Sequence, residues 1–209
     1  HTRRRRQRQM CIRDSYWTII FPKNLLDLNI LQLSLNTIYL VFLSSAVLII
    51  FSFIANYGNR VTRSKFLNFL TMFSITGYAI PGVILAVAFI TFVAWFDNNI
   101  IKYYELSSIK KIFIGSIIGL VIVYFIRFYS LAYNGLKSGY ERINRSIDES
   151  SYLLGYSKIK TFLGIHVPYL RNSIFLIGIL ISIEIIKELP ITLILRPFNF
   201  ETFATTAYI

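Results

Sequence analysis

The chemistry open to this chain is limited first by its histidines and its cysteine. Among its 209 residues there are two histidines, His1 and His166, and one cysteine, Cys11. An intramembrane enzyme, one alternative for so apolar a chain, needs a serine–histidine pair, paired aspartates or a zinc motif. The sequence contains neither H-E-x-x-H nor G-x-S-x-G, and it lacks the G-x-x-x-x-G-K-[ST] phosphate loop of an ATPase. We therefore expect no enzymatic activity, no metal site and no bound cofactor.

Three ionisable residues lie close together in an otherwise apolar stretch. Glu184, Lys187 and Glu188 are three and four residues apart, a spacing that places them on one face of a helix. Ionisable groups at membrane depth are costly and tend to face a pathway or one another. Two interpretations are open. These residues line a translocation path or an external gate, or they form a self-compensating ion pair near the outer interface, which is the favoured interpretation.

The composition indicates that such residues are held by membrane-spanning helices. The chain is 55% hydrophobic and 15% charged, whereas soluble domains carry about 25% charged residues. No charged residue lies between Asp27 and Arg60 or between Lys65 and Asp97. Each gap exceeds the roughly 20 apolar residues that a helix needs to cross a bilayer. We expect an all-α, polytopic bundle.

Four apolar segments are expected to cross the membrane, within a bundle of about 4–5 spans. They are Leu33–Ala55, Tyr78–Phe96, Ile112–Tyr129 and the weaker Ser173–Leu189. The uncharged stretch Phe66–Phe96 is too long for one untilted helix, so we expect an entering helix, Phe66–Ile75, and then a break. Gly77, Pro81 and Gly82 supply that break and are candidates for the translocation path.

Basic residues give the orientation of the bundle. The loop Asn56–Lys65 contains Arg60, Arg63 and Lys65 and no acid, which is typical of the cytoplasmic side. The long polar segment 132–172 is expected on the same side. Asp97–Lys111 and Pro190–Ile209 are expected outside, the second as a loop or re-entrant stretch. Arg127 is expected near the inner end of its span, with its side chain reaching the interface.

The net charge of +12 does not indicate a nucleic-acid partner. Six of the 22 basic residues lie in residues 1–15, and most others flank apolar segments. Residues 10–15 resemble the translation of a transposon end used in sequencing libraries. We therefore expect residues 1–15 to be an assembly artefact; a native basic tail is the alternative. Residues 16–32 are interpreted as a connecting segment and 33–209 as the membrane domain.

The most specific pattern lies in the long inner loop. It reads D-E-S-S-Y-L-L-G from Asp148 to Gly155, followed after nine residues by I-H-V-P, which ends at Pro168. Ser146 or Asp148 can cap a short helix, and Gly155 can end it in a left-handed conformation. Ser157 can then cap a second helix that runs to about Ile165. This pattern predicts two short helices that project from the membrane around a glycine turn.

This segment resembles the EAA signature of the permease subunits of bacterial ABC importers. Serines replace both alanines and Val167 replaces a leucine. The resemblance implies a type I importer permease in the bacterial inner membrane, whose short helices form the coupling site for a separate ATPase. The implied coupling residues are Asp148, Glu149, Ser150, Ser151, Leu154, Gly155, Ile165 and Pro168. The implied partners are a cytoplasmic ATPase dimer that uses ATP, an external solute-binding protein and a second permease half.

Two further stretches resemble one group of these permeases. Ile75–Ala86, and more closely the K-E-L-P-x-T-L-x-L-R-P-F-x-F-x-T pattern of Lys187–Thr202, are similar to ferric-iron permeases and their thiamine-transporting relatives. The resemblance implies ferric iron as cargo, with thiamine or polyamines as alternatives. It also implies the C-terminal half of a two-half permease, cut before its last span. An ion channel is the distant alternative, because a channel would not need the spacing found in the coupling loop.

Overall fold

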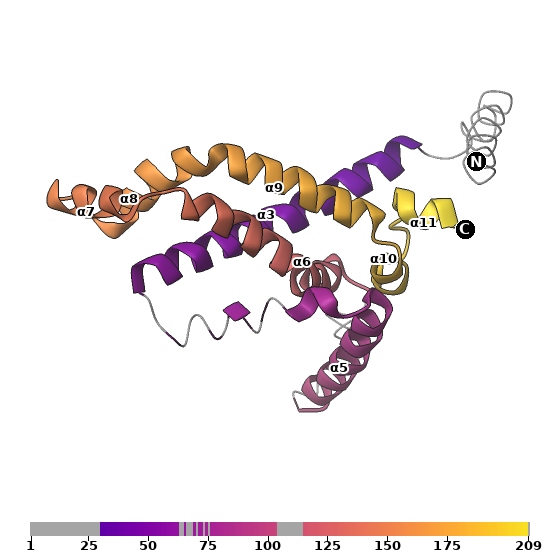
Figure 1. Cartoon of the computed structure of the whole chain (residues 1–209). Helices are drawn as coiled ribbons and strands as arrows, with labels where there is room; N and C mark the ends of the chain where they lie inside the picture. Colours follow the sequence, from indigo (N-terminus) through magenta and orange to yellow (C-terminus); the bar gives the residue numbers. More distant parts are fainter. Residues whose placement is uncertain are drawn as a thin grey trace, which may run out of the picture.

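The computed structural model describes residues 30–62, 76–103 and 115–208, with residues 65, 69, 71, 72 and 74 as single positions. Every regular element in this part of the chain is a helix, which confirms the all-α expectation. Residues 1–15, nearly all of segment 16–32 and most of the expected Phe66–Ile75 helix lie outside the described residues, as does most of the loop after Asp97. In Figure 1 three long helices, α3, α6 and α9, form the body, with α7 and α8 at one end and α10 and α11 at the other.

Three of the described helices are long and apolar enough to cross a membrane. They are α3 (Ile30–Thr62), α6 (Ile117–Glu141) and a continuous helical stretch, Lys158–Lys187. This last stretch consists of α8 (Lys158–Thr161), the π-helical segment η2 (Phe162–His166) and α9 (Val167–Lys187). The expected break before the second apolar segment is present: a short 3₁₀ helix, η1 (Thr76–Ala79), precedes α5 (Gly82–Tyr103), whose apolar part is Gly82–Asp97.

Several expected helix ends are wrong. Helix α5 runs past Phe96 into the expected external loop as far as Tyr103, and α9 begins at Val167 rather than at Ser173. Two further ends differ because the side chains near them pack on a neighbouring helix. Helix α3 continues past Ala55 through most of the expected cytoplasmic loop to Thr62. Asn56 donates to the backbone oxygen of Tyr133 (3.2 Å) and Asn59 to its hydroxyl (3.0 Å), so the polar end of α3 stays packed on α6. Helix α6 likewise continues beyond Tyr129 to Glu141, with its aromatic face buried.

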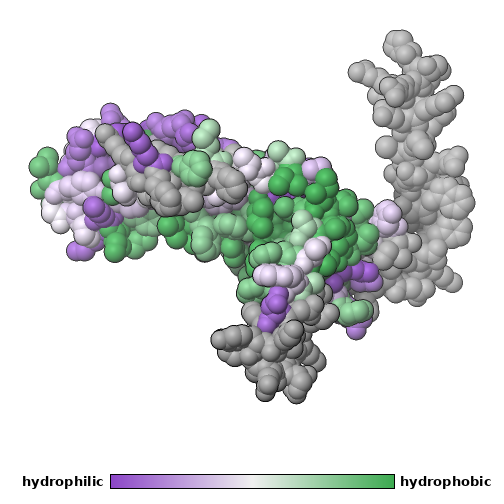
Figure 2. Space-filling model, turned by 90° about the horizontal axis from the view of Figure 1, so that it is seen from below, coloured by the Kyte–Doolittle hydropathy of each residue, from purple (hydrophilic) through white to green (hydrophobic). Residues whose placement is uncertain are grey.

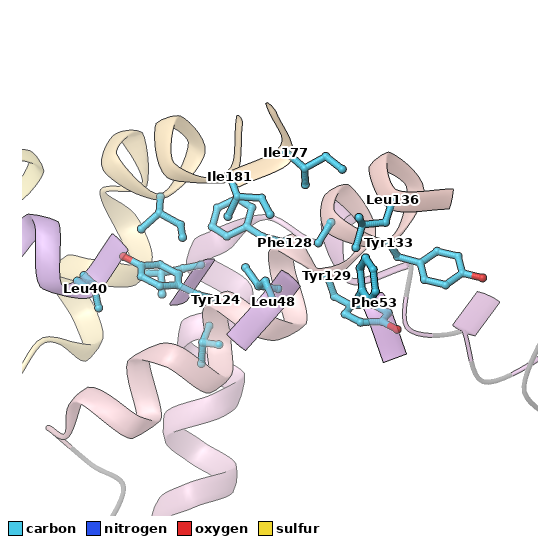
Figure 3. Packing of buried hydrophobic residues seen from close by; sticks show 14 of the residues in the cluster. Leu40, Leu48, Phe53, Tyr124, Phe128, Tyr129, Tyr133, Leu136, Ile177 and Ile181 are labelled. Atoms are coloured by element: carbon cyan, nitrogen blue, oxygen red, sulfur yellow. The ribbon is translucent and has the colours of Figure 1, made fainter. Parts of the chain in front are cut away.

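The core lies where α6 packs between α3 and α9 (Figure 3). Tyr124 and Phe128 of α6 are fully buried there, and Leu48 of α3 lies against the same cluster. Gly135 and Gly139 let α9 approach closely. A Cβ at either glycine would lie 2.8 Å from the side chain of Ile177 or Leu170, respectively. Small residues spaced by four commonly allow such close approach of membrane helices.

The surface has an apolar middle and a polar end. Large apolar side chains are exposed along α3 and α9, Phe42 and Phe175 among them at 74% and 68%. Figure 2 shows a hydrophobic surface over the middle of the molecule and hydrophilic residues at the end that carries α7 and α8. Exposed apolar side chains over the length of several helices are what lipid contact requires. This distribution agrees with a bundle embedded in a membrane by its middle.

The C-terminal region returns to the start of α3 through two short helices. These are α10 (Pro190–Leu195) and α11 (Phe203–Tyr208), in the segment expected to be a loop or re-entrant stretch. The backbone N–H of Phe203 donates to Thr37 Oγ1 (3.2 Å), and Asn36 donates to the backbone oxygen of Glu201 (3.2 Å). These polar contacts hold the C-terminal region against the first long helix.

Candidate functional site

The segment with the most specific sequence pattern folds as a hairpin of two short helices. The first is α7 (Arg145–Leu153). Its cap is Asn144, whose side chain accepts from the N–H of Ser146 (3.3 Å), so the expectation of Ser146 or Asp148 as cap is wrong. Asp148 is instead turned inward, with 14% of its side chain exposed. An asparagine two residues earlier supplies the same acceptor, which the sequence alone did not distinguish.

The glycine turn between the short helices is confirmed. Gly155 has a φ of +81°. The N–H of Gly155 donates to the oxygen of Tyr152, and that of Tyr156 to the oxygen of Ser151, both at 3.0 Å. This is the Schellman arrangement that glycine favours, because a left-handed residue ends the helix. Ser157 caps α8 as expected by accepting from the N–H of Lys160 (3.3 Å).

The second short helix does not stop near Ile165, as the sequence suggested. It runs into α9 through the π-helical segment η2, where the N–H of Val167 donates to the oxygen of Phe162. Pro168 has no N–H, and its ring crowds the preceding turn of an α-helix. One wider turn accommodates the proline without ending the helix. The second short helix and the span therefore form one continuous helical stretch, Lys158–Lys187.

A buried hydrogen bond fastens the two short helices to each other. The hydroxyls of Ser151 on α7 and Thr161 on α8 lie 3.0 Å apart, and both residues are buried. A small polar residue at position 151 is therefore required for packing. A groove of about 480 Å³ lies beside this contact. It is lined by Ser146, Ile147, Ser150, Ser151, Leu154, Tyr156, Gly164 and Ile165.

The outer side of the hairpin exposes apolar side chains. Leu153 is 89% exposed, Leu154 77% and Ile159 72%. Glu149 and Pro168 are also exposed. Leucines so open to solvent at the polar end of the molecule are typical of a protein–protein contact. The predicted coupling residues thus divide into an outer set, which includes Glu149 and Leu154, and an inner pair, Asp148 and Ser151.

Arg60, whose position in the sequence indicates only the orientation of the bundle, contacts the inner side of this hairpin. Its Nε donates to Asp148 Oδ2 (2.6 Å), and 12% of the arginine side chain is exposed. The other carboxylate oxygen of Asp148 lies 2.9 Å from Nε2 of the fully buried His166. Nothing in the sequence around Arg60 indicates that it pairs with a residue 88 positions later.

A second polar cluster lies at the opposite end of the core. Arg127 Nε lies 3.2 Å from Glu188 Oε2, and Arg127 also donates to the backbone oxygen of Ile80 (2.7 Å). Arg127 is therefore in the interior of α6, paired with a carboxylate, and the expectation that it reaches the inner interface is wrong. Thr192 donates to the backbone oxygen of Glu188 and shares a hydrogen bond with the hydroxyl of Tyr124.

The residues predicted for the translocation path are partly brought together. Gly77 is buried in η1, where an added Cβ would overlap the backbone oxygen of Ile126. Gly82, after Pro81, begins α5 against the carboxylate of Glu188. Glu184 and Lys187 lie apart from this junction and form an ion pair with each other, at 2.8 Å. Glu188 does not continue their helical face, because the backbone leaves the helix there and its side chain turns toward Arg127.

The described residues contain no group of three or more histidine, cysteine, aspartate or glutamate side chains that could hold a metal ion.

A comparison with protein families matches residues 48–205 to the family described as the inner membrane component of binding-protein-dependent transport systems. The match includes the hairpin, the Arg127–Glu188 pair and all three long helices in whole or in part. A comparison with curated proteins finds no match.

Proposed function

Because the chain belongs to the inner membrane components of binding-protein-dependent transport systems, we propose that the α7–α8 hairpin couples it to a separate ATPase and that its cargo is ferric iron. The chain is a permease subunit of an ABC importer. Its proposed partners are a cytoplasmic ATPase dimer, an external solute-binding protein and a second permease half. Its proposed location is the bacterial inner membrane, which it crosses several times.

The exposure of Leu153, Leu154 and Ile159 is the observation that carries the coupling proposal. These side chains belong to the hairpin, at the end of the molecule where Figure 2 shows hydrophilic residues, so we expect them to face water rather than lipid. A rigid apolar projection suits a groove in a cytoplasmic partner. The buried Ser151–Thr161 contact supports the proposal further. Because it joins α7 to α8, the two helices would move together when the ATPase pushes on one of them.

The junction around Glu188 is proposed as part of the gate of the translocation path. Gly77, Pro81 and Gly82 place a break in the helix beside the Arg127–Glu188 pair. Broken helices and ionisable groups at membrane depth are typical of transport paths. Glu184 and Lys187 are proposed to act only as an exposed ion pair at the end of α9.

The coupling proposal is tested in proteoliposomes that contain the complete transporter. Leu153→Asp and Leu154→Asp should reduce co-purification of the ATPase and abolish the stimulation of ATP hydrolysis by the loaded binding protein. The control is Ser138→Asp, which adds the same charge at an exposed position of α6 outside the hairpin. If the ATPase still co-purifies with both leucine variants and remains stimulated, the hairpin is not the docking site.

The cargo is tested in the same liposomes with radiolabelled ferric iron and, separately, radiolabelled thiamine. The iron proposal rests on the resemblance of Lys187–Thr202 to ferric-iron permeases. ATP-dependent uptake of ferric iron supports it, whereas uptake of thiamine alone overturns the cargo and leaves the coupling proposal standing.

The gate is tested with Pro81→Cys in a Cys11→Ser background. Its labelling by a membrane-impermeant maleimide should change when nucleotide is trapped, and an unchanged rate would contradict a gate there.

A further inference from the structure

Arg60 joins the cytoplasmic end of α3 to three parts of the chain at once. Its Nε donates to Asp148 on α7 (2.6 Å). One terminal nitrogen donates to the backbone oxygen of Tyr140 (3.2 Å), and the other donates to those of Ile143 (3.0 Å) and Asn144 (3.1 Å). One guanidinium thus contacts the end of α6, the turn that follows and the first turn of the hairpin.

Asp148 extends this contact to α9. Its second carboxylate oxygen lies 2.9 Å from Nε2 of His166, which belongs to the π-helical segment between α8 and α9. The ring of His166 packs against Tyr57 and Tyr140, with ring centroids 5.2 and 5.5 Å apart. Tyr57 in turn donates its hydroxyl proton to the backbone oxygen of Lys158 on α8 (2.7 Å). Both helices of the hairpin are therefore bound to the end of α3.

From these contacts we propose that Arg60, with Asp148 and His166, transmits movement of the hairpin to the long helices; the proposal rests on the coupling function proposed above. Arg60 is a positioning residue that does not touch the ATPase. A hairpin fastened only by its own backbone could pivot at the Asn144 turn and at the wide turn of η2. The Arg60–Asp148–His166 cluster prevents rotation at both of these turns. Displacement of α7 must therefore displace α3, α6 and α9 together.

An ordinary basic residue at the cytoplasmic end of a span would be solvated and interchangeable. Arg60 and Asp148 are instead mostly buried, at 12% and 14% of their side chains, and His166 is fully buried. A planar guanidinium can serve four acceptors in different directions, whereas a lysine ammonium cannot match that geometry. The cluster is therefore expected to require arginine itself at position 60.

The experiment compares Arg60→Gln, Arg60→Lys and Asp148→Asn in the complete transporter in liposomes. All three should insert, and the ATPase should still co-purify, because Leu153 and Leu154 remain exposed. Stimulation of ATP hydrolysis by the loaded binding protein should fall about tenfold, the effect of losing one charge-assisted contact. The ratio of solute transported to ATP hydrolysed should fall as well, which a loss of stability alone would not cause. Lys137→Gln, an exposed cation on α6, is the control and should behave as the wild type.

A distance measurement separates transmission from simple destabilisation. Spin labels at Lys160 on α8 and Leu35 on α3, both exposed, should change their separation little on nucleotide trapping in the wild type. In Arg60→Gln and Asp148→Asn the hairpin should move without α3, so the change should be larger. Wild-type coupling in these variants, or loss of ATPase binding or of insertion in all three, overturns the proposal. Failure of the leucine variants to weaken docking would instead overturn the coupling function itself.

Discussion

The side chains of Arg127 and Glu188 meet at 3.2 Å, between Nε and Oε2, although the two residues are 61 positions apart in sequence. The arginine comes from the interior of α6 and the glutamate from the point where α9 ends and α10 is about to begin. Because the same guanidinium donates to the oxygen of Ile80, the pair also holds η1. Three chain segments that the sequence separates are thus fixed at one charge pair.

Replacing one partner of the Arg127–Glu188 pair should lower the free energy of unfolding more than replacing both. Arg127→Met or Glu188→Leu alone leaves a charge that is 10–20% exposed without its counter-ion, which typically costs about 3–5 kcal/mol. The double variant Arg127→Met/Glu188→Leu should recover much of that loss. Thermal unfolding of the four proteins in detergent gives the coupling free energy. Strictly additive losses would mean that the two charges do not stabilise each other.

The hydroxyl of Tyr124 should contribute a small, separable amount to stability. Thr192 donates its hydroxyl proton to the backbone oxygen of Glu188, so Tyr124 donates to Thr192. In Tyr124→Phe the threonine keeps its other bond, and the expected loss is about 1 kcal/mol. Tyr39→Phe, at a tyrosine that is 52% exposed on α3, is the matched control and should change the free energy of unfolding little. Equal effects of the two variants would contradict the buried hydrogen bond.

Gly77 should tolerate no side chain, for a steric reason. An added Cβ would overlap the backbone oxygen of Ile126, and a backbone atom in the middle of α6 cannot rotate away. Gly77→Ala should therefore displace η1 from α6 and strongly reduce the amount of folded protein in the membrane. Gly58→Ala is the control, since nothing lies within 4 Å of a Cβ there. That change should stabilise α3 by up to about 1 kcal/mol, the difference in helix propensity. Comparable yields of the two variants would contradict the close approach of η1 to α6.

Much of the architecture was predictable because apolar length and local caps leave few alternatives. Uncharged stretches such as residues 28–59 indicated long membrane helices, and Gly155 and Ser157 indicated a turn and a cap that the structure confirms. The exact helix ends were not predictable. Asn56, Asn59 and Arg60 look like residues of a polar loop until their partners on α6 and α7 are known. Polarity gives no information on whether a side chain faces water or another helix.

The candidate site was predictable only where its residues are local in sequence. The hairpin could be recognised from spacing within 21 residues, Asp148 to Pro168. Arg60 and Arg127 could not, because each pairs with an acid 88 or 61 positions later. The spacing of Glu184, Lys187 and Glu188 predicts that they share one helical face. The backbone of Glu188 leaves the helix, so only Glu184 and Lys187 pair with each other. Spacing rules describe a continuous helix and fail at its last residue.

Gly155 is constrained by its backbone conformation and not by the space around it. Its φ of +81° is a conformation that L side chains rarely adopt, yet nothing lies within 4 Å of an added Cβ. Substitutions there should act through backbone strain and through the partner surface, not through clashes inside the bundle. Gly155→Asn should be tolerated, because asparagine enters the left-handed region readily, and Gly155→Ala should cost about 1 kcal/mol.

Gly155→Glu adds both strain and a charge next to Leu154, in the middle of the proposed docking surface. We expect this variant to insert into the membrane as the wild type does and to lose the stimulation of ATP hydrolysis by the loaded binding protein. The measurements are the yield of inserted protein and the hydrolysis rate with and without the binding protein. Gly155→Asn controls for the change in backbone, so a defect confined to Gly155→Glu locates the effect at the partner surface. Normal transport by Gly155→Glu would count directly against a coupling role for this turn.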